Sequence, residues 1–193
     1  MPLYGDEDII RARVAAYNAK KNVITEKVVI DGTTYQFERR VFPPDFSMVL
    51  PKSFEIMSAE NVIKKYHRED RPDIILSNTE TTVNIVFTRM AIQSEKLEER
   101  LTKYIAWIKK LYPSNVFYTE RIFENYPRIA CYDYRGFALD TDIYNLSFFT
   151  DLPDGELFGG FNCPIDVHEN WKPLVWQMIK TLKALPPDHK IAP

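Results

Sequence analysis

The residues that could take part in nucleophilic chemistry are few and widely spaced. Cys163 precedes His168 by five residues, so a thiol and an imidazole could meet where a predicted strand ends and a helix begins. A nucleophilic thiolate needs an exposed, electropositive environment. Cys163 instead stands between Phe161 and Pro164, which indicates apolar surroundings. Core packing is therefore the prediction for Cys163, and a Cys–His pair is the alternative.

Two carboxylates, Asp140 and Asp142, lie two residues apart in a segment predicted to be a strand, so they share one face. They could carry out acid–base chemistry if they were buried close together. They could also bind a cation, but the segment lacks the further oxygen ligands and central glycine of a calcium loop. We expect them to face solvent. An enzyme site could still assemble from distant residues, namely Asp140, Asp142, Cys163 and His168.

The common metal and nucleotide sites are not indicated. The three histidines, at positions 67, 168 and 189, are scattered, whereas a zinc site needs three or four clustered ligands. The chain has six glycines and none between Thr33 and Arg135. Phosphate-binding loops use glycine because the backbone must approach the phosphate closely. The sequence therefore predicts no metal and no other cofactor.

Two tryptophans are the candidates for contact with a partner. Trp176 lies about 140° from Trp171 around the axis of a predicted C-terminal helix, outside its apolar stripe. Trp107 lies at the edge of the apolar stripe of a predicted middle helix. Exposed tryptophans are enriched at protein interfaces. For Trp176 the alternative is that it packs under the N-terminal segment, and both interpretations stay open.

The composition is that of one globular domain. The chain has 193 residues, of which 45% are hydrophobic and 27% are charged, enough for a sizeable core. The formal charge is −2, which provides no global field for nucleic acid, so nucleic acid is not an expected partner. No apolar run approaches the ~20 residues that span a bilayer, and we expect no membrane contact.

Compartment follows from the opening residues and the cysteines. Residues 1–8 are acidic and polar, unlike the basic and apolar regions of a secretory signal, which favours a cytoplasmic location. Cys131 and Cys163 both lie in apolar, strand-like segments. Two buried free thiols are typical of a reducing compartment, and a disulfide between neighbouring strands is the alternative.

Two long amphipathic helices are predicted from residues that repeat every three or four positions, over 94–112 and over 167–185. Their apolar stripes comprise Leu97, Leu101, Tyr104, Ile105, Ile108 and Leu111 in the first helix, and Trp171, Leu174, Val175, Met178, Ile179 and Leu182 in the second. Because each helix has one apolar stripe, each must cover a face of a sheet.

The remaining segments predict antiparallel strands. Hairpins are expected over 23–42, turning at Asp31-Gly32, and over 73–89. A meander is expected at 115–124, 128–134, 137–149 and 156–163. The fold class is α+β: a curved antiparallel sheet flanked by two helices, sandwich-like. The domain spans 23–186, after a helix or arm at 1–22 and before a polar tail at 187–193.

Short motifs resemble a known fold. The segment Phe46-Ser47-Met48-Val49-Leu50-Pro51, followed by Ser53-Phe54-Glu55, resembles the opening of the PsbP-like fold. The segment Phe158-Gly159-Gly160-Phe161-Asn162-Cys163-Pro164, running into Trp171 and a terminal helix, resembles its closing part. The middle hairpin and the long helix ending at Tyr112-Pro113 are also similar. The resemblance covers about residues 40–185.

The resemblance implies binding to other proteins. The fold is named for an extrinsic photosystem II subunit and is shared by a Ran-binding import factor, by periplasmic lipoproteins and by cytosolic chaperones that shield apolar helices of secreted toxins. It carries no fixed binding motif, so no binding residue is transferred. We therefore expect a non-enzymatic cytoplasmic adaptor or chaperone-like domain with a protein partner. An enzyme and a homodimer formed through a sheet edge or helix are the alternatives.

Overall fold

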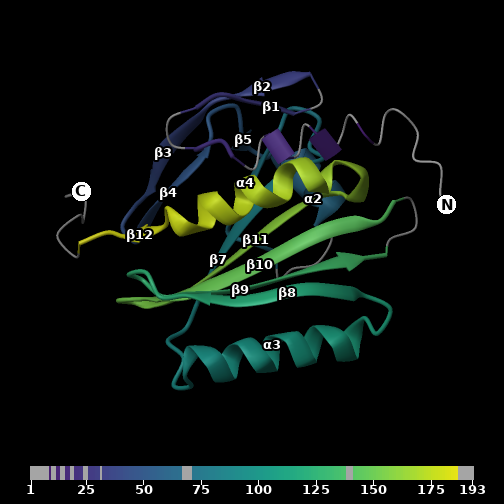
Figure 1. Cartoon of the computed structure of the whole chain (residues 1–193). Helices are drawn as coiled ribbons and strands as arrows, with labels where there is room; N and C mark the ends of the chain where they lie inside the picture. Colours follow the sequence, from purple (N-terminus) through teal and green to yellow (C-terminus); the bar gives the residue numbers. More distant parts are fainter. Residues whose placement is uncertain are drawn as a thin grey trace.

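The computed structural model describes residues 9, 12–13, 16–17, 20–23, 26–30, 32–66, 71–137 and 141–186. In this part of the chain the strands form three antiparallel sheets, of seven, three and two strands (Figure 1). The α+β class with antiparallel pairing is confirmed. The prediction of one sheet is wrong, because strands from the N-terminal third pair among themselves and with the end of the chain.

The largest sheet contains the meander. Its strand order is β5-β6-β7-β11-β10-β9-β8, and all neighbours are antiparallel. The bounds are β5 Glu55–Ile56, β6 Ile74–Ser77, β7 Asn84–Met90, β8 Val116–Phe123, β9 Ile129–Gly136, β10 Ile143–Leu152 and β11 Gly155–Pro164. The second hairpin and the meander are thus confirmed. However, β10 begins at Ile143, so Asp142 precedes the strand, and Asp140 lies outside the described residues.

Two small sheets contain the rest of the strands. The first pairs β1 (Val28–Ile30) with β2 (Thr33–Tyr35) around Gly32, which has φ 77°. The second has the order β12-β4-β3, formed by Lys183–Ala184, Phe46–Pro51 and Phe37–Phe42. The predicted hairpin over 23–42 is therefore only partly right. Its second half divides at Gln36, and β3 turns to pair with β4.

The helices whose full bounds lie within the described residues are α2 (Ala59–Lys65), α3 (Leu97–Leu111) and α4 (His168–Lys180), with a 3₁₀ turn at Ile165–Val167. Figure 1 shows α3 on one face of the seven-stranded sheet and α4 on the other, between that sheet and the strands β1–β4. The second long helix ends five residues before the predicted 185. Thr181 ends it, because its hydroxyl donates to Met178 O at 2.6 Å and accepts from Val49 N at 2.8 Å.

The seven-stranded sheet is apolar on both faces. Along β9, Ala130 and Tyr132 pack toward α3, while Ile129 and Cys131 pack toward α4. Gly159 in β11 allows one close contact, because a Cβ there would lie 2.1 Å from Cζ of Phe148. The ring of Phe148 therefore packs directly against the backbone of Gly159.

The two ends of the chain are described only in part. The helix or arm expected over 1–22 falls mostly outside the described residues, and the polar tail at 187–193 falls wholly outside them. Tyr17, which is described, is 61% exposed. Near residue 22 the chain contacts α4, where Gln177 accepts from Val23 N at 3.3 Å and donates to Lys21 O at 2.8 Å.

Candidate functional site

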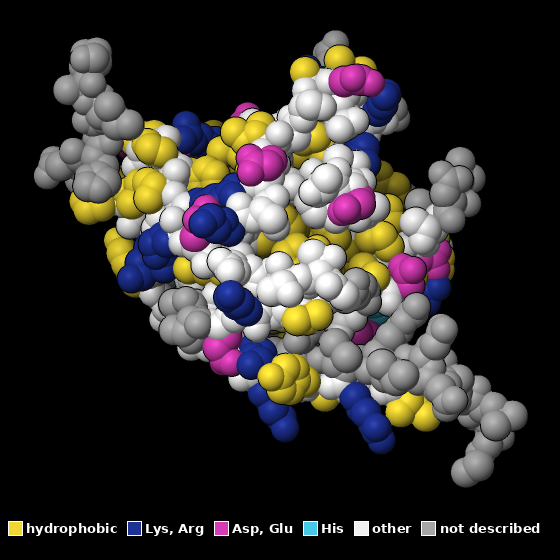
Figure 2. Space-filling view, turned by 90° about the horizontal axis from the view of Figure 1, so that it is seen from above, with side chains coloured by type: hydrophobic (Ala, Val, Ile, Leu, Met, Phe, Trp, Pro, Cys, Tyr) yellow, Lys and Arg dark blue, Asp and Glu magenta, His cyan; other side chains and the backbone are white. Residues whose placement is uncertain are grey.

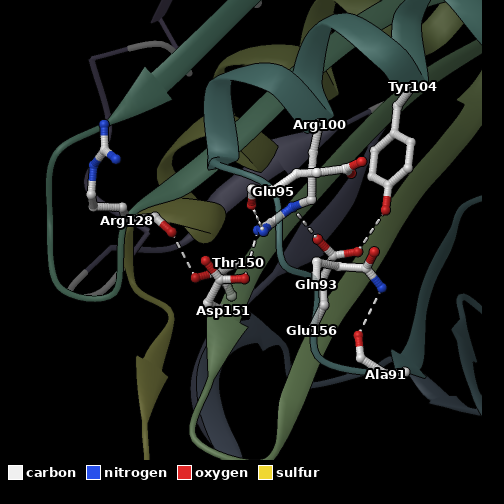
Figure 3. Close-up of polar contacts among 9 residues, drawn as sticks. All are labelled: Ala91, Gln93, Glu95, Arg100, Tyr104, Arg128, Thr150, Asp151 and Glu156. Carbon is white, nitrogen blue, oxygen red and sulfur yellow. Dashed lines mark hydrogen bonds and ion pairs between the residues drawn. The ribbon is translucent and has the colours of Figure 1, made fainter.

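A charged cluster lies between α3 and the seven-stranded sheet (Figure 3). The side chain of Arg100 is 2% exposed, and its Nε lies 2.8 Å from Oε2 of Glu156, whose side chain is fully buried. The Tyr104 hydroxyl donates to Oε1 of Glu156 at 2.8 Å. A charge taken out of water requires such partners, so the cluster attaches α3 to β11.

The guanidinium of Arg100 is held on further sides. It donates to Glu95 O at 2.7 Å and forms an ion pair of 2.6 Å with Asp151, whose side chain is 61% exposed. Figure 3 shows the guanidinium pointing to these groups and to Glu156. Burial raises the pKa of Glu156, against the opposing effects of Tyr104 and Arg100. Because its side chain has no exposed surface, the carboxyl group is not accessible to a ligand.

Two clefts flank Arg89 at the end of β7. One, of about 440 Å³, has Phe46, Phe87 and Leu157 among its lining residues. The other, of about 280 Å³, is lined in part by Met90 and by the turn between β10 and β11. The Arg89 side chain forms an ion pair with Asp45. The larger cleft has the size of a small-ligand pocket, but neither contains a residue that the sequence analysis proposed.

Residues of the alternative enzyme site approach one another around Tyr144. Cys163 is the cross-strand partner of Tyr144, and the His168 ring lies 5.4 Å from the Tyr144 ring. Asp142 pairs with Arg135, whose Nε donates to its carboxylate at 2.8 Å. Asp140 is not among the described residues. Thus Asp142 and the Cys–His pair share one region, although no direct contact between Cys163 and His168 defines a nucleophile and its base.

The two cysteines are free and buried, as the sequence predicts. Burial raises the pKa of the Cys163 thiol, and the nearby Asp166 raises it further. Burial also raises the pKa of Cys131, to about 12, although Arg121 and Lys180 oppose the rise. Both thiols are therefore protonated at neutral pH, which disfavours nucleophilic attack.

A second charged cluster, between α4 and the sheet, was not found from the sequence. Asp133 on β9 is completely buried and pairs with Lys172 at 2.6 Å. It also accepts from the Tyr144 hydroxyl at 2.9 Å and from Thr119 N at 2.8 Å. The available signal was an aspartate after the apolar run at 129–132. For the first cluster, the available signal was an arginine, Arg100, beside the apolar stripe of α3.

Trp176 is half-buried and packs against β8. Its ring centroid lies 5.9 Å from that of Phe123, in a T-shaped arrangement, and the Arg121 guanidinium lies 5.8 Å from the indole. The alternative, packing under the apolar residues Ile10 and Val14, concerns residues outside the described ranges. Trp176 thus has an aromatic neighbour on its own side of the sheet and remains partly accessible.

Trp107, at the edge of the apolar stripe of α3, is 59% exposed. Leu111, four residues later, is 48% exposed, and Tyr112 is 54% exposed. The expectation that Leu111 belongs to the buried stripe is wrong. Periodicity sets the direction of a side chain around the helix, but it does not say whether the sheet extends beneath the last turn. We call Trp107, Leu111 and Tyr112, three exposed apolar residues at the C-terminal end of α3, the α3 surface.

Within the described part of the chain there is neither a cluster of metal ligands nor a helix that could span a membrane. No group of three or more His, Cys, Asp or Glu residues within it is placed to hold a metal ion. No helix within it is long and apolar enough to cross a membrane. Figure 2 shows one face of the molecule, on which cationic and anionic side chains are interspersed with exposed hydrophobic ones.

Comparison with known proteins identifies the fold. The solution structure of the cyanobacterial PsbP protein CyanoP from Synechocystis sp. PCC 6803 matches with a TM-score of 0.58 at 10% identity, covering 77% of this chain and 92% of CyanoP. A Pseudomonas aeruginosa protein of unknown function, PA94, matches with a TM-score of 0.49 at 13% identity, covering 78% of this chain and 98% of its own. No family model and no curated protein matches the chain. The chain has a PsbP-like fold, as the sequence motifs predict.

Proposed function

We propose that this protein is a non-enzymatic cytoplasmic adaptor or chaperone-like domain, and that a protein partner binds the α3 surface. The observation that carries the proposal is Trp107, which is 59% exposed on a helix that the ion pair of Arg100 with Glu156 fixes to the sheet. Exposed tryptophans with apolar neighbours are frequent anchors of protein interfaces. Leu111 and Tyr112 extend the apolar area at the same end of the helix.

The rigid attachment of α3 supports this role. The ion pair of Arg100 with Glu156 and the hydrogen bond from Tyr104 hold the inner side of the helix. A helix held in this way loses little conformational entropy on binding, so more of the contact energy remains for affinity. The partner surface that suits Trp107 is apolar, such as one side of an amphipathic helix.

An enzymatic function is the weaker alternative. The candidates around Tyr144 lie together, but burial keeps Cys163 protonated and Asp142 is paired with Arg135. The described clefts at Arg89 lie elsewhere. The observation in favour of an enzyme is only the proximity of Cys163 and His168 to the same tyrosine ring.

A homodimer through the sheet edge is the other alternative. In the described part of the chain β8 is the last strand of the large sheet, with eight residues. Its pairing with β9 is irregular between Phe117 and Thr119, and Glu120 and Arg121 lie at its centre. Irregular pairing and charges are features that protect an edge strand against pairing with another copy. Light scattering at micromolar concentration tests this alternative directly.

The test of the proposal is comparative affinity capture from a lysate of the source organism. Wild type, Trp107→Ala and Tyr126→Ala are used as baits, and the captured proteins are quantified by mass spectrometry. Tyr126 is the matched control, since it is an exposed aromatic residue in the turn before β9, at 91% exposure. We expect at least one protein that wild type and Tyr126→Ala retain and that Trp107→Ala loses. If no captured protein depends on Trp107, the proposal is wrong.

A further inference from the structure

Cationic and aromatic side chains alternate where α4 faces β8. On α4, Lys172, Trp176 and Lys180 follow one another at intervals of four residues, so they lie on one side of the helix. The opposing residues of β8 are Tyr118, Arg121 and Phe123. We call these six residues the α4–β8 seam.

The contacts within the seam are cation–aromatic contacts. Lys172 Nζ lies 4.9 Å from the Tyr118 ring centroid, and Lys180 Nζ lies 5.0 Å from that of Phe123. The Arg121 guanidinium is 5.8 Å from the Trp176 ring and 5.9 Å from the Phe123 ring. Such contacts hold the cationic side chains in place, near the surface, before any ligand arrives.

The seam has an excess of positive charge. Lys172 is neutralised by the buried carboxylate of Asp133. Arg121 and Lys180 are both exposed, and no carboxylate within the described residues forms an ion pair with either side chain. Both cations lie close enough to the buried Cys131 to oppose the rise in its pKa. Carboxylates form charge-assisted hydrogen bonds with arginine and lysine, so they are a ligand chemistry that fits two fixed cations.

We infer that the α4–β8 seam binds an acidic peptide segment, with Arg121 and Lys180 as the groups that contact its carboxylates. This interaction goes beyond the proposed function, because the seam lies on the other side of the sheet from the α3 surface (Figure 1). Nucleic acid fits the seam less well. Arg121, Lys172 and Lys180 occupy positions over the rings on which bases would stack, and two unpaired cations provide little counterion release.

The experiment is a titration of ¹⁵N-labelled full-length protein at low salt. The probes are capped hexaglutamate, capped hexaglutamine and the oligonucleotide dT6, and the signals are the three tryptophan indole N–H resonances, assigned with single Trp→Phe variants. We expect hexaglutamate to shift the Trp176 signal and to leave those of Trp107 and Trp171 unchanged. Hexaglutamine should cause no shift, and the hexaglutamate shift should decrease as salt is raised, since salt screens exposed charges.

Two double variants with the same change in net charge provide the control. Arg121→Glu/Lys180→Glu reverses the seam, whereas Lys109→Glu/Lys110→Glu reverses two cations on α3. The seam variant should weaken hexaglutamate binding about tenfold, and the α3 variant less than about twofold. If the seam variant fails to give the native spectrum, Arg121→Gln/Lys180→Gln replaces it, with weakened binding expected again.

Three outcomes would overturn the inference: no shift at Trp176, equal weakening by the seam variant and its control, or tighter binding of dT6 than of hexaglutamate with the same shifts. The last result would assign the seam to nucleic acid. The Trp107→Ala variant should bind hexaglutamate like wild type. Failure here is therefore distinguishable from failure of the proposed α3 surface, which depends on Trp107 and not on Arg121 or Lys180.

Discussion

Each face of the seven-stranded sheet has an ion pair beneath its helix, and the two pairs differ in how deeply the cationic partner is buried. Under α3 both charges are enclosed: the Arg100 side chain is 2% exposed and that of Glu156 is 0% exposed. Under α4 only the carboxylate of Asp133 is enclosed, while the Lys172 side chain is 32% exposed. The comparison indicates that the first pair attaches a helix to the sheet, and that the second connects the core with a charged surface.

The two faces also differ in how far their tryptophans are exposed. On the α3 face Trp107 is exposed, whereas on the α4 face Trp176 is partly covered by Arg121 and Phe123. At its C-terminal end α3 has exposed apolar residues, Trp107, Leu111 and Tyr112, beside the exposed lysines Lys109 and Lys110. Along α4, Lys172 and Lys180 contact aromatic rings of β8 and stay near the surface. We therefore expect the two faces to differ in stability and in the kind of ligand that each attracts.

The largest expected effect on stability comes from breaking the ion pair of Arg100 with Glu156 under α3. Glu156→Ala leaves the Arg100 guanidinium buried with only the partly exposed Asp151 as a charged partner, and we expect a loss of about 3–5 kcal/mol in the free energy of unfolding. Urea unfolding followed by circular dichroism measures it. The matched change, Asp151→Ala, removes the exposed partner and should cost about 1 kcal/mol or less. Equal losses would contradict the view that the enclosed pair attaches α3.

A smaller effect on stability is expected from breaking the ion pair of Asp133 with Lys172 under α4. Lys172→Met leaves the buried carboxylate of Asp133 with two compensating hydrogen bonds, from the Tyr144 hydroxyl and from Thr119 N. We expect a loss of about 1–3 kcal/mol in the same urea experiment. The comparison between the two faces would be wrong if Lys172→Met destabilised the protein more than Glu156→Ala.

The pH dependence of stability sharpens the comparison. Burial raises the pKa of Glu156 above its ordinary value of 4.5, so the folded protein binds this proton more tightly than the unfolded chain. This contribution is fully present below the unfolded value and is lost as pH rises through the raised folded value. Relative to Glu156→Gln, wild type should therefore gain stability as pH falls from 8 toward 4.5. A difference that is constant with pH would show that Glu156 titrates normally.

The smallest effect concerns the thiols on the α4 face. Cys131 lies beneath the seam, and burial raises its pKa to about 12, so we expect almost no reaction with Ellman's reagent at pH 8 in the folded protein. The variant Cys163→Ser isolates this thiol, and full reaction should follow denaturation in urea. Rapid reaction of native Cys163→Ser would mean that solvent reaches Cys131 past the side chains of Lys172 and Lys180, and would contradict its burial.

Local patterns predicted the elements well, and contacts between distant residues account for what was missed. Tight turns and alternation predicted the meander, and apolar periodicity predicted two segments, 94–112 and 167–185, that contain α3 and the shorter α4. The end of α4 depends on Thr181 bonding to Val49 in a strand far away in the sequence, which no local pattern encodes. The division of the expected sheet has the same origin, because β12 pairs with β4.

The candidate sites show the same limit. Helical periodicity correctly placed Trp107 at the edge of its stripe, but it left Trp176 undecided because the cover for that indole comes from Phe123 on β8. Arg100 and Asp133 were passed over, because a single polar residue beside an apolar pattern is usually exposed. Their burial depends on Glu156 and Lys172, which are distant in the sequence.

The central claim is that a protein partner contacts the α3 surface. Site-specific photo-cross-linking in cells of the source organism tests it most directly, with p-benzoylphenylalanine placed at position 107, at 126 or at 176. The account predicts a cross-linked partner from position 107 and none of the same mass from position 126. The same partner captured equally from 107 and 126, or from 176 alone, would contradict the account.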